Sequence, residues 1–153
     1  MGSGRLMVIT LATPKDIESL IARADLRSPV SKISQREVDR FCELSGDGQR
    51  IHRVNSASDP VIVPGNMLVA RLPGMIQAVF TVEMFSHCFT AAYRDVKFLQ
   101  PLHVDEIHML QLQIQSVRAR EDQTFVKMHC ELVSDAGTAF RAQLTDIYFN
   151  GMQ

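Results

Sequence analysis

A carboxylate and an imidazole lie five positions apart in a short loop punctuated by glycines, Ser45-Gly46-Asp47-Gly48-Gln49-Arg50-Ile51-His52. Two such side chains on one rigid turn can bind a single water molecule between them. One can take a proton from this water while the other gives a proton to the substrate, which hydration or dehydration beside a carbonyl requires. Glycines around an aspartate are also ordinary turn chemistry. The pattern therefore predicts either a catalytic pair, Asp47 and His52, or a structural turn.

A helix is expected to precede this loop and fix its start. Ser34 and Glu37 have the spacing of a capping box, which satisfies the first free amides of a helix. Gly46 can end the helix in the left-handed conformation, so that Asp47 follows its last turn directly. The buried face of this helix is expected to contain Val38, Phe41 and Cys42.

A second helix is expected from Gly65 to Phe80, where nearly every residue is apolar. Apolar residues on all sides predict a helix that is buried all round. Pro73 and Gly74 are expected to kink it. Arg71 is its polar exception, and we interpret it as reaching solvent or carbonyls freed by Pro73 in preference to contacting a substrate.

The second half of the chain has the two-residue period of β-strands. Apolar and polar residues alternate over residues 110–115, 126–132 and 140–144, and over a shorter stretch at 95–98. Asp135-Ala136-Gly137 is a turn signal between the last two strands. Antiparallel strands with one apolar face need a cover, and the helix from Gly65 can supply it. The predicted fold class is α+β, a hotdog fold in which an antiparallel sheet wraps around a long central helix.

The chain is expected to form one domain over residues 1–153, because 153 residues with 46% hydrophobic content can build a single sizeable core. Residues 1–4 look like a cloning remnant. Residues 5–30 are expected to be an N-terminal strand and helix extension. Its helix starts at Thr13 and Pro14 and has an apolar face made of Ile17, Leu20, Ile21 and Ala24.

Composition excludes several classes of function. A net charge of −1 gives no electrostatic case for binding nucleic acid or an anionic membrane. Cys42, Cys88 and Cys130 are odd in number and far apart, which favours reduced thiols in a cytoplasmic protein. The five histidines lack metal-ligand spacing, so no metal is expected. No apolar run is long enough to span a membrane.

The segment from Ser45 to His52 resembles the Gly-Asp-x-x-x-Ile-His motif of the MaoC-like (R)-specific enoyl-CoA hydratases, and Gln49 resembles the branch that includes nodulation protein N. Weaker similarities are Pro64-Gly65-Asn66-Met67-Leu68, at the start of the family's central helix, and Val96-Lys97-Phe98 with Pro101. The resemblance implies that Asp47 and His52 are catalytic in a hydro-lyase of fatty acid metabolism. The substrate would be an enoyl or 3-hydroxyacyl thioester of coenzyme A or acyl carrier protein, with no other cofactor.

Free amides at the start of the helix, at Gly65 and Asn66, are expected to bind the thioester oxygen. The resemblance also implies a homodimer that pairs sheet edges, with the Asp47 loop of one subunit near the helix N-terminus of the other.

The sequence departs from the family at three places that bear on activity. Pro64 replaces the usual histidine, Val54 stands where an aspartate is usual, and the stretch from His52 to Gly65 is short. Two other functions therefore stay open. One is a non-catalytic subunit that binds acyl thioesters or serves assembly, and the other is a hotdog thioesterase.

Overall fold

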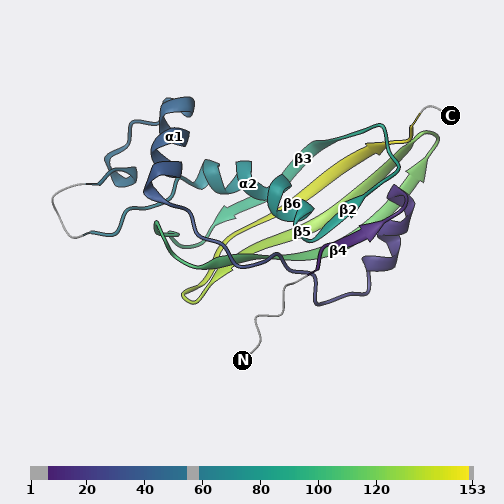
Figure 1. The fold of residues 1–153 in the computed structure, drawn as a ribbon, viewed down its shortest axis with the longest axis horizontal. Helices are drawn as coiled ribbons and strands as arrows, with labels where there is room; N and C mark the ends of the chain where they lie inside the picture. Colours follow the sequence, from purple (N-terminus) through teal and green to yellow (C-terminus); the bar gives the residue numbers. More distant parts are fainter. Residues whose placement is uncertain (1–6, 55–58, 152–153) are drawn as a thin grey trace.

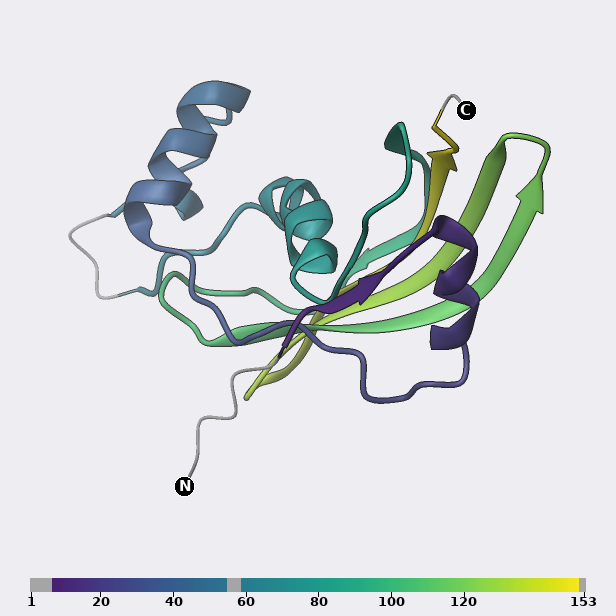
Figure 2. The same ribbon diagram turned by 45° about the vertical axis from the view of Figure 1, so that its right-hand side comes forward.

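The computed structural model describes residues 7–54 and 59–151. Its main feature is a four-stranded antiparallel sheet, in the spatial order β3-β6-β5-β4, that curls around helix α2 (Figures 1 and 2). The helix spans Gly65–Gln77, and the strands are β3 (His87–Phe98), β4 (His108–Arg120), β5 (Gln123–Ser134) and β6 (Gly137–Phe149). The predicted α+β hotdog architecture is confirmed.

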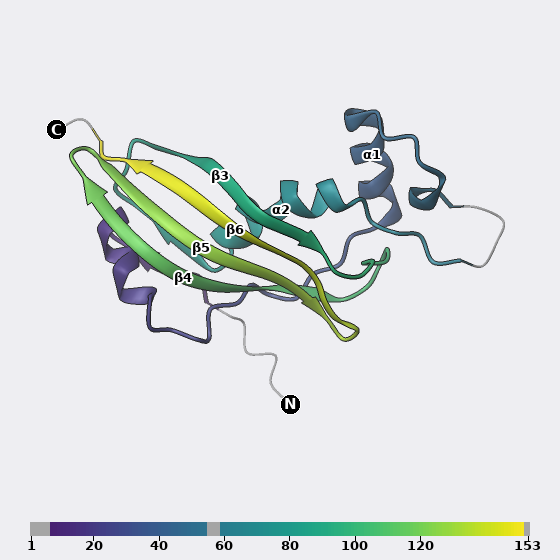
Figure 3. The ribbon, with the colours of Figure 1, turned by 180° about the vertical axis from the view of Figure 1, so that it is seen from behind.

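The core lies between α2 and the concave face of the sheet. Successive side chains of a strand point to opposite faces, so alternate residues are buried along most of β5 and β6 and along the first half of β4. Helix α2 contributes Met67, Leu68, Leu72 and Ile76 to this core. The opposite face of the sheet has no helix over it in the described part of the chain (Figure 3).

Helix α2 is shorter and less buried than the sequence suggested. It ends at Gln77, and Phe80–Val82 forms strand β2, which pairs in parallel with β1 (Ile9–Leu11) as a separate two-stranded sheet. The expectation of a helix buried all round is wrong for the single chain, because one sheet covers only one side of a helix. The uncovered side consists of small or polar residues, namely Asn66, Ala70, Pro73, Gly74 and Gln77.

The predicted N-terminal helix is a 3-10 helix, η1 (Pro14–Leu20), with the expected start at Thr13. A 3-10 helix has three residues per turn, so the residues that it buries are Pro14, Ile17 and Leu20. Ile21 and Ala24, which an α-helical period would place on the same face, are exposed.

Helix α1 (Gln35–Ser45) has both predicted caps. The Ser34 hydroxyl accepts a hydrogen bond from the Glu37 amide, and Gly46 ends the helix with φ of 76°. Val38 is buried, whereas Phe41 and Cys42 are only half-buried, because α1 stands off at one end of the sheet (Figure 1). Among the described residues, no helix has the length and apolar character needed to cross a membrane.

The two edges of the sheet differ. The β4 edge is partly covered by the segment 26–31, through backbone hydrogen bonds such as Ser28 N to Leu110 O and Leu112 N to Leu26 O. No strand pairs with the free edge of β3 within the described residues. The β3 edge is also apolar, and five of its large side chains are between 37% and 52% exposed: Phe89, Tyr93, Val96, Phe98 and Leu99.

Candidate active site

The loop after α1 positions Asp47 by short-range contacts. Gly46 ends the helix in the left-handed conformation, so the chain turns sharply there. Oδ1 of Asp47 then accepts a hydrogen bond of 3.1 Å from the Gln49 amide, which is the contact of an Asx turn. This bond leaves Oδ2 free to face the next element, the short 3-10 turn η2 (Arg50–His52).

His52 is buried, and a backbone carbonyl fixes the orientation of its ring. Nδ1 lies 2.6 Å from the carbonyl oxygen of Ile62, which can only accept, so Nδ1 carries the proton and Nε2 of the neutral ring has a free lone pair. The Ile62 amide in turn donates to Ile51 O at 3.0 Å, and Val104 N donates to Val61 O at 2.9 Å. The carbonyl that orients His52 is therefore itself fixed from two sides.

The two predicted catalytic side chains face each other. Oδ2 of Asp47 is 3.6 Å from Nε2 of His52, and the side chains are 24% and 6% exposed. This distance is too long for a direct hydrogen bond, and both atoms are acceptors when the ring is neutral. A water molecule can donate one proton to each of them and keep its lone pairs free. The arrangement can therefore bind and activate one water.

The start of α2 lies beside this pair. A pocket of about 550 Å³ is lined by Asp47, His52, Gly65 and Asn66, so the structure brings the four predicted site residues of one chain together. The first backbone amides of a helix have no carbonyl partner in a preceding turn. In α2 these amides belong to Gly65 and Asn66, which line the pocket. The helix N-terminus of a second subunit is not required to complete the arrangement.

Phe98, at the end of β3, is a pocket residue that the sequence analysis did not assign to the site. Its ring packs on Gly65 so closely that a Cβ at position 65 would lie 2.7 Å from the ring. The Phe98 ring therefore approaches the backbone at position 65 more closely than any residue other than glycine would allow. The sequence did show a phenylalanine at the end of the strand before Pro101. It gave no indication that this residue contacts Gly65, which lies far away in sequence.

Arg71 is placed differently from either reading of the sequence. Its Nη1 lies 3.2 Å from Oε1 of Glu37, so it links α2 to the first turn of α1, and it does not line the pocket of Asp47. The Ser34 backbone amide and hydroxyl, together with Arg71, hold the pKa of the Glu37 carboxyl below its usual value. We interpret Arg71 as a contact between the two helices.

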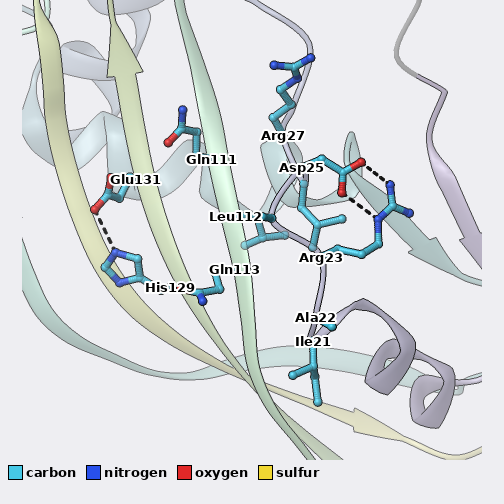
Figure 4. Close-up of a pocket in the computed structure, with 12 residues that line it drawn as sticks. Ile21, Ala22, Arg23, Asp25, Arg27, Gln111, Leu112, Gln113, His129 and Glu131 are labelled. Carbon is cyan, nitrogen blue, oxygen red and sulfur yellow. Dashed lines mark hydrogen bonds and ion pairs between the residues drawn. The ribbon is translucent and has the colours of Figure 1, made fainter.

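A second hollow, of about 530 Å³, lies at the β4 side of the molecule between the segment 21–27 and the outward side chains of β4 and β5 (Figure 4). Four of its five ionisable side chains form pairs, Arg23 with Asp25 at 2.7 Å and His129 with Glu131 at 3.1 Å, and the fifth is the cation Arg27. Groups paired in this way offer no free base or nucleophile, so this hollow is a weaker candidate than the pocket at Asp47.

The comparisons with known proteins agree with the fold. No family model and no curated protein sequence matches the chain. Many solved structures resemble it, and three of them are described here. An (R)-hydratase from A. caviae involved in PHA biosynthesis is 18% identical, with 78% of this chain and 90% of that one covered and a TM-score of 0.63. A MaoC-like dehydratase from Rhodospirillum rubrum is 14% identical, with 90% and 98% covered and a TM-score of 0.65.

The third is the HadBC complex, a (3R)-hydroxyacyl-ACP dehydratase from Mycobacterium tuberculosis. It is 14% identical, with 80% of this chain and 93% of that one covered and a TM-score of 0.60. The chain therefore has the hotdog fold of the MaoC-like dehydratases and (R)-hydratases. The narrower resemblance of Gln49 to the nodulation protein N branch stays a prediction.

Proposed function

We propose that the protein is an (R)-specific enoyl-thioester hydratase, or in reverse a 3-hydroxyacyl-thioester dehydratase. The observation that carries the proposal is the facing pair of Oδ2 of Asp47 and Nε2 of His52, 3.6 Å apart. The pair lies in one pocket with the N-terminus of α2. The hotdog fold that the chain shares with known hydratases and dehydratases supports the same reaction class. The substrate is a thioester of coenzyme A or acyl carrier protein, and the reaction uses no other cofactor.

In the hydration direction, the bound water attacks the β-carbon of a trans-2-enoyl thioester. Asp47 acts as the main general base and takes one proton of the water as the carbon–oxygen bond forms. His52 shares this proton traffic, since its Nε2 lone pair also faces the water. The pair then delivers the proton taken from the water to the α-carbon, so the net change is the addition of one water across the double bond and both side chains return to their starting state.

Negative charge develops on the thioester oxygen during this addition. The backbone amides of Gly65 and Asn66 are donors set in place before the reaction, at the positive end of the α2 dipole. The missing side chain at Gly65 makes room for the Phe98 ring beside these amides. Pro64, which stands in place of the family's usual histidine, caps the helix with its carbonyl, which accepts from Met67 N at 3.0 Å.

The free edge of β3 supports a homodimer. A strand edge exposes unpaired amides and carbonyls, and this edge is lined by large apolar side chains. A two-fold axis would pair β3 of one subunit with β3 of its partner as antiparallel strands. The HadBC neighbour is itself a complex of chains. We therefore expect a homodimer in solution.

Crotonyl-coenzyme A tests the reaction. Enoyl absorbance should fall without release of free thiol, and the product should be the (3R) alcohol. Release of thiol would instead identify a thioesterase. No turnover with short, medium and aromatic acyl groups on either carrier would favour a non-catalytic subunit that binds acyl thioesters.

A further inference from the structure

A second carboxyl, Asp146 on β6, lies buried under the opposite end of α2. It is only 8% exposed, although its strand neighbours on the same face are apolar. The hydroxyl of Thr90 donates to its Oδ1 at 2.8 Å. Oδ2 has no such partner among the described residues, and the carboxyl borders a pocket. Oδ2 is not one of the fully buried polar atoms, so it is open to the pocket, where a water molecule or a polar group of a ligand can satisfy it.

The pocket at this carboxyl, here called the Asp146 pocket, has a volume of about 410 Å³. Apolar side chains form most of its wall: Pro73, Ile76, Phe80, Val82 and Phe85. Polar side chains line it at the sheet, namely Thr90, Asp146 and Tyr148, and Gln77 and Thr81 add two more from α2 and β2. A mostly apolar pocket with a few convergent polar groups is the usual form of a small-molecule site.

The Asp146 pocket is separate from the site of Asp47 within one chain. Gly65 and Ile76 mark the two sites on α2, and at 1.5 Å per residue they are roughly 16 Å apart. Leu68 and Leu72 are buried against the sheet between them. A substrate bound at Asp47 therefore does not reach Asp146 of the same chain through the core.

The two sites come together when two subunits pair through β3. Cys88 and Thr90, near the start of the strand, line the Asp146 pocket, whereas Phe98 at its end lines the pocket of Asp47. Antiparallel pairing about a two-fold axis brings the first half of one strand opposite the second half of the other. The Asp146 pocket of one subunit then adjoins the pocket of Asp47 of its partner.

We propose that the Asp146 pocket receives the distal end of the acyl group bound at the Asp47–His52 pair of the other subunit, and that it selects acyl groups with a terminal hydroxyl. This inference rests on the proposed function and on the β3 dimer. A hydroxyl can donate to the free oxygen of Asp146, which an alkyl terminus would leave unsatisfied in an apolar pocket. Burial raises the pKa of the Asp146 carboxyl despite the Thr90 hydrogen bond. This desolvation favours a neutral hydroxyl over an ammonium group.

Binding measurements test the selection without requiring turnover. Saturated acyl-coenzyme A thioesters with six, eight and ten carbons are titrated calorimetrically, each with and without a terminal hydroxyl. At the length that reaches Asp146, the hydroxylated form should bind about tenfold more tightly, the factor that one such hydrogen bond supplies. Asp146→Leu should abolish or reverse the preference, and the isosteric Thr90→Val should reduce it. Thr145→Val, on the opposite face of β6, is the matched control and should keep it.

Equal binding of both forms at every length, or a preference that survives in Asp146→Leu, would overturn the inference. Crotonyl-coenzyme A, whose acyl group is too short to reach Asp146, tests the proposed function separately in the wild-type protein. If crotonyl-coenzyme A is hydrated but the binding preference is absent, the Asp146 inference fails. If the preference is present but crotonyl-coenzyme A is not hydrated, the proposed function fails.

Mixed dimers test whether the pocket acts on the partner's site. One chain carries Asp47→Asn with His52→Ala, and the other carries Asp146→Leu, with different tags for purification. The single intact pair then adjoins an intact Asp146 only if the pocket comes from the other subunit. We expect turnover of a terminally hydroxylated enoyl thioester to stay preferred over the plain one. A lost preference would show that the pocket serves its own chain.

Discussion

The two carboxyls at opposite ends of α2 have the same side chain and opposite environments. Asp47 lies in a loop, is 24% exposed, and faces an imidazole at 3.6 Å. Asp146 lies in the middle of a sheet, is 8% exposed, and within the described part of the chain has only the hydroxyl of Thr90 as a hydrogen-bond partner. The environment, and not the residue type, therefore decides what each can do.

The difference separates proton transfer from recognition. Asp47 has a water-accessible oxygen beside a second acceptor, so it can exchange a proton with a bound water. Asp146 is largely buried in a pocket with mostly apolar walls, where a charged carboxylate is disfavoured and a hydrogen-bonded neutral partner is preferred. One end of the helix is suited to chemistry and the other to choosing the substrate.

The largest expected effect breaks the first half of this comparison. Asp47→Asn and His52→Ala should each lower turnover of crotonyl-coenzyme A by roughly 10²–10⁴-fold, the range for loss of a positioned acid or base. The double variant should be little worse than either single one, because both side chains act on one water. Asp135→Asn, in the exposed β5–β6 turn, is the control. Wild-type turnover in either variant would falsify the catalytic pair.

The second prediction concerns the β3 edge. Pairing of two subunits through this edge is what brings the Asp146 pocket of one subunit beside the Asp47 site of the other. Tyr93→Lys combined with Val96→Lys places like charges opposite one another near the two-fold axis, which should separate the dimer into monomers. Turnover of an enoyl thioester that is long enough to reach the Asp146 pocket should fall with the dimer fraction, because that pocket comes from the partner. Light scattering and turnover are measured on the same samples, with Gln113→Lys on β4 as control.

A monomer mass at micromolar concentration with turnover intact would contradict both the dimer and the shared site. A stable dimer in the lysine variant would show that subunits meet through another surface.

Local patterns predicted the parts of the fold whose determinants are close in sequence. The capping box at Ser34 and the terminating Gly46 specify α1 by contacts within four residues. The two-residue alternation of β4, β5 and β6 reflects one buried face and one open face. Both signals are written in neighbouring residues, so one sequence is enough to read them.

Other elements depend on contacts that a single sequence does not display. Strand β3 was recognised only near Val96 and Phe98. Its first half is only partly buried on one face, its second half is exposed on both faces, and Asp95, with φ of 50°, interrupts the alternation. The parallel pairing of β1 with β2 joins segments far apart in the chain. Neither has a local signature.

The candidate site divides in the same way. The spacing of Asp47 and His52 and the resemblance to a known family predicted them as a catalytic pair, but the carbonyl of Ile62 that orients His52 is supplied by tertiary packing. Asp146 had an unused signal. The alternation that places Leu144 on the buried face of β6 continues to Asp146, and a carboxyl at a buried strand position is a reason to look for a ligand.

A smaller effect is expected from changing the close approach at Gly65. In Gly65→Ala, the new Cβ would lie 2.7 Å from the Phe98 ring, so the ring or the helix start must shift. We expect turnover to fall by about tenfold, because a displaced amide no longer meets the developing oxyanion. Adding Phe98→Ala should restore part of the loss by making room, and Phe98→Ala alone measures the ring's own contribution. Full turnover in Gly65→Ala would show that the reaction does not depend on the close contact between Gly65 and the Phe98 ring.

The smallest expected effect is on stability and concerns Asp146. Burial raises the pKa of this carboxyl above its ordinary value of 3.8, and the hydrogen bond from Thr90 only partly opposes the shift. The folded protein therefore favours the protonated acid. The contribution of Asp146 to stability is complete below the unfolded pKa and is lost as the pH rises through the higher folded pKa. Cys88 and Tyr148, which border the same pocket, stay neutral in this range because burial raises the pKa of both.

The neutral variant Asp146→Asn isolates this effect, since it keeps the shape of the side chain and removes its titration. Its free energy of unfolding, compared with that of the wild-type protein by urea denaturation, should improve as the pH rises from about 4 toward neutrality. Each unit of the pKa difference changes that comparison by about 1.4 kcal/mol. A difference between the two proteins that does not change with pH would show that Asp146 is solvated like an ordinary carboxylate. The contrast with Asp47 would then be lost, because both ends of α2 would present the same kind of acid.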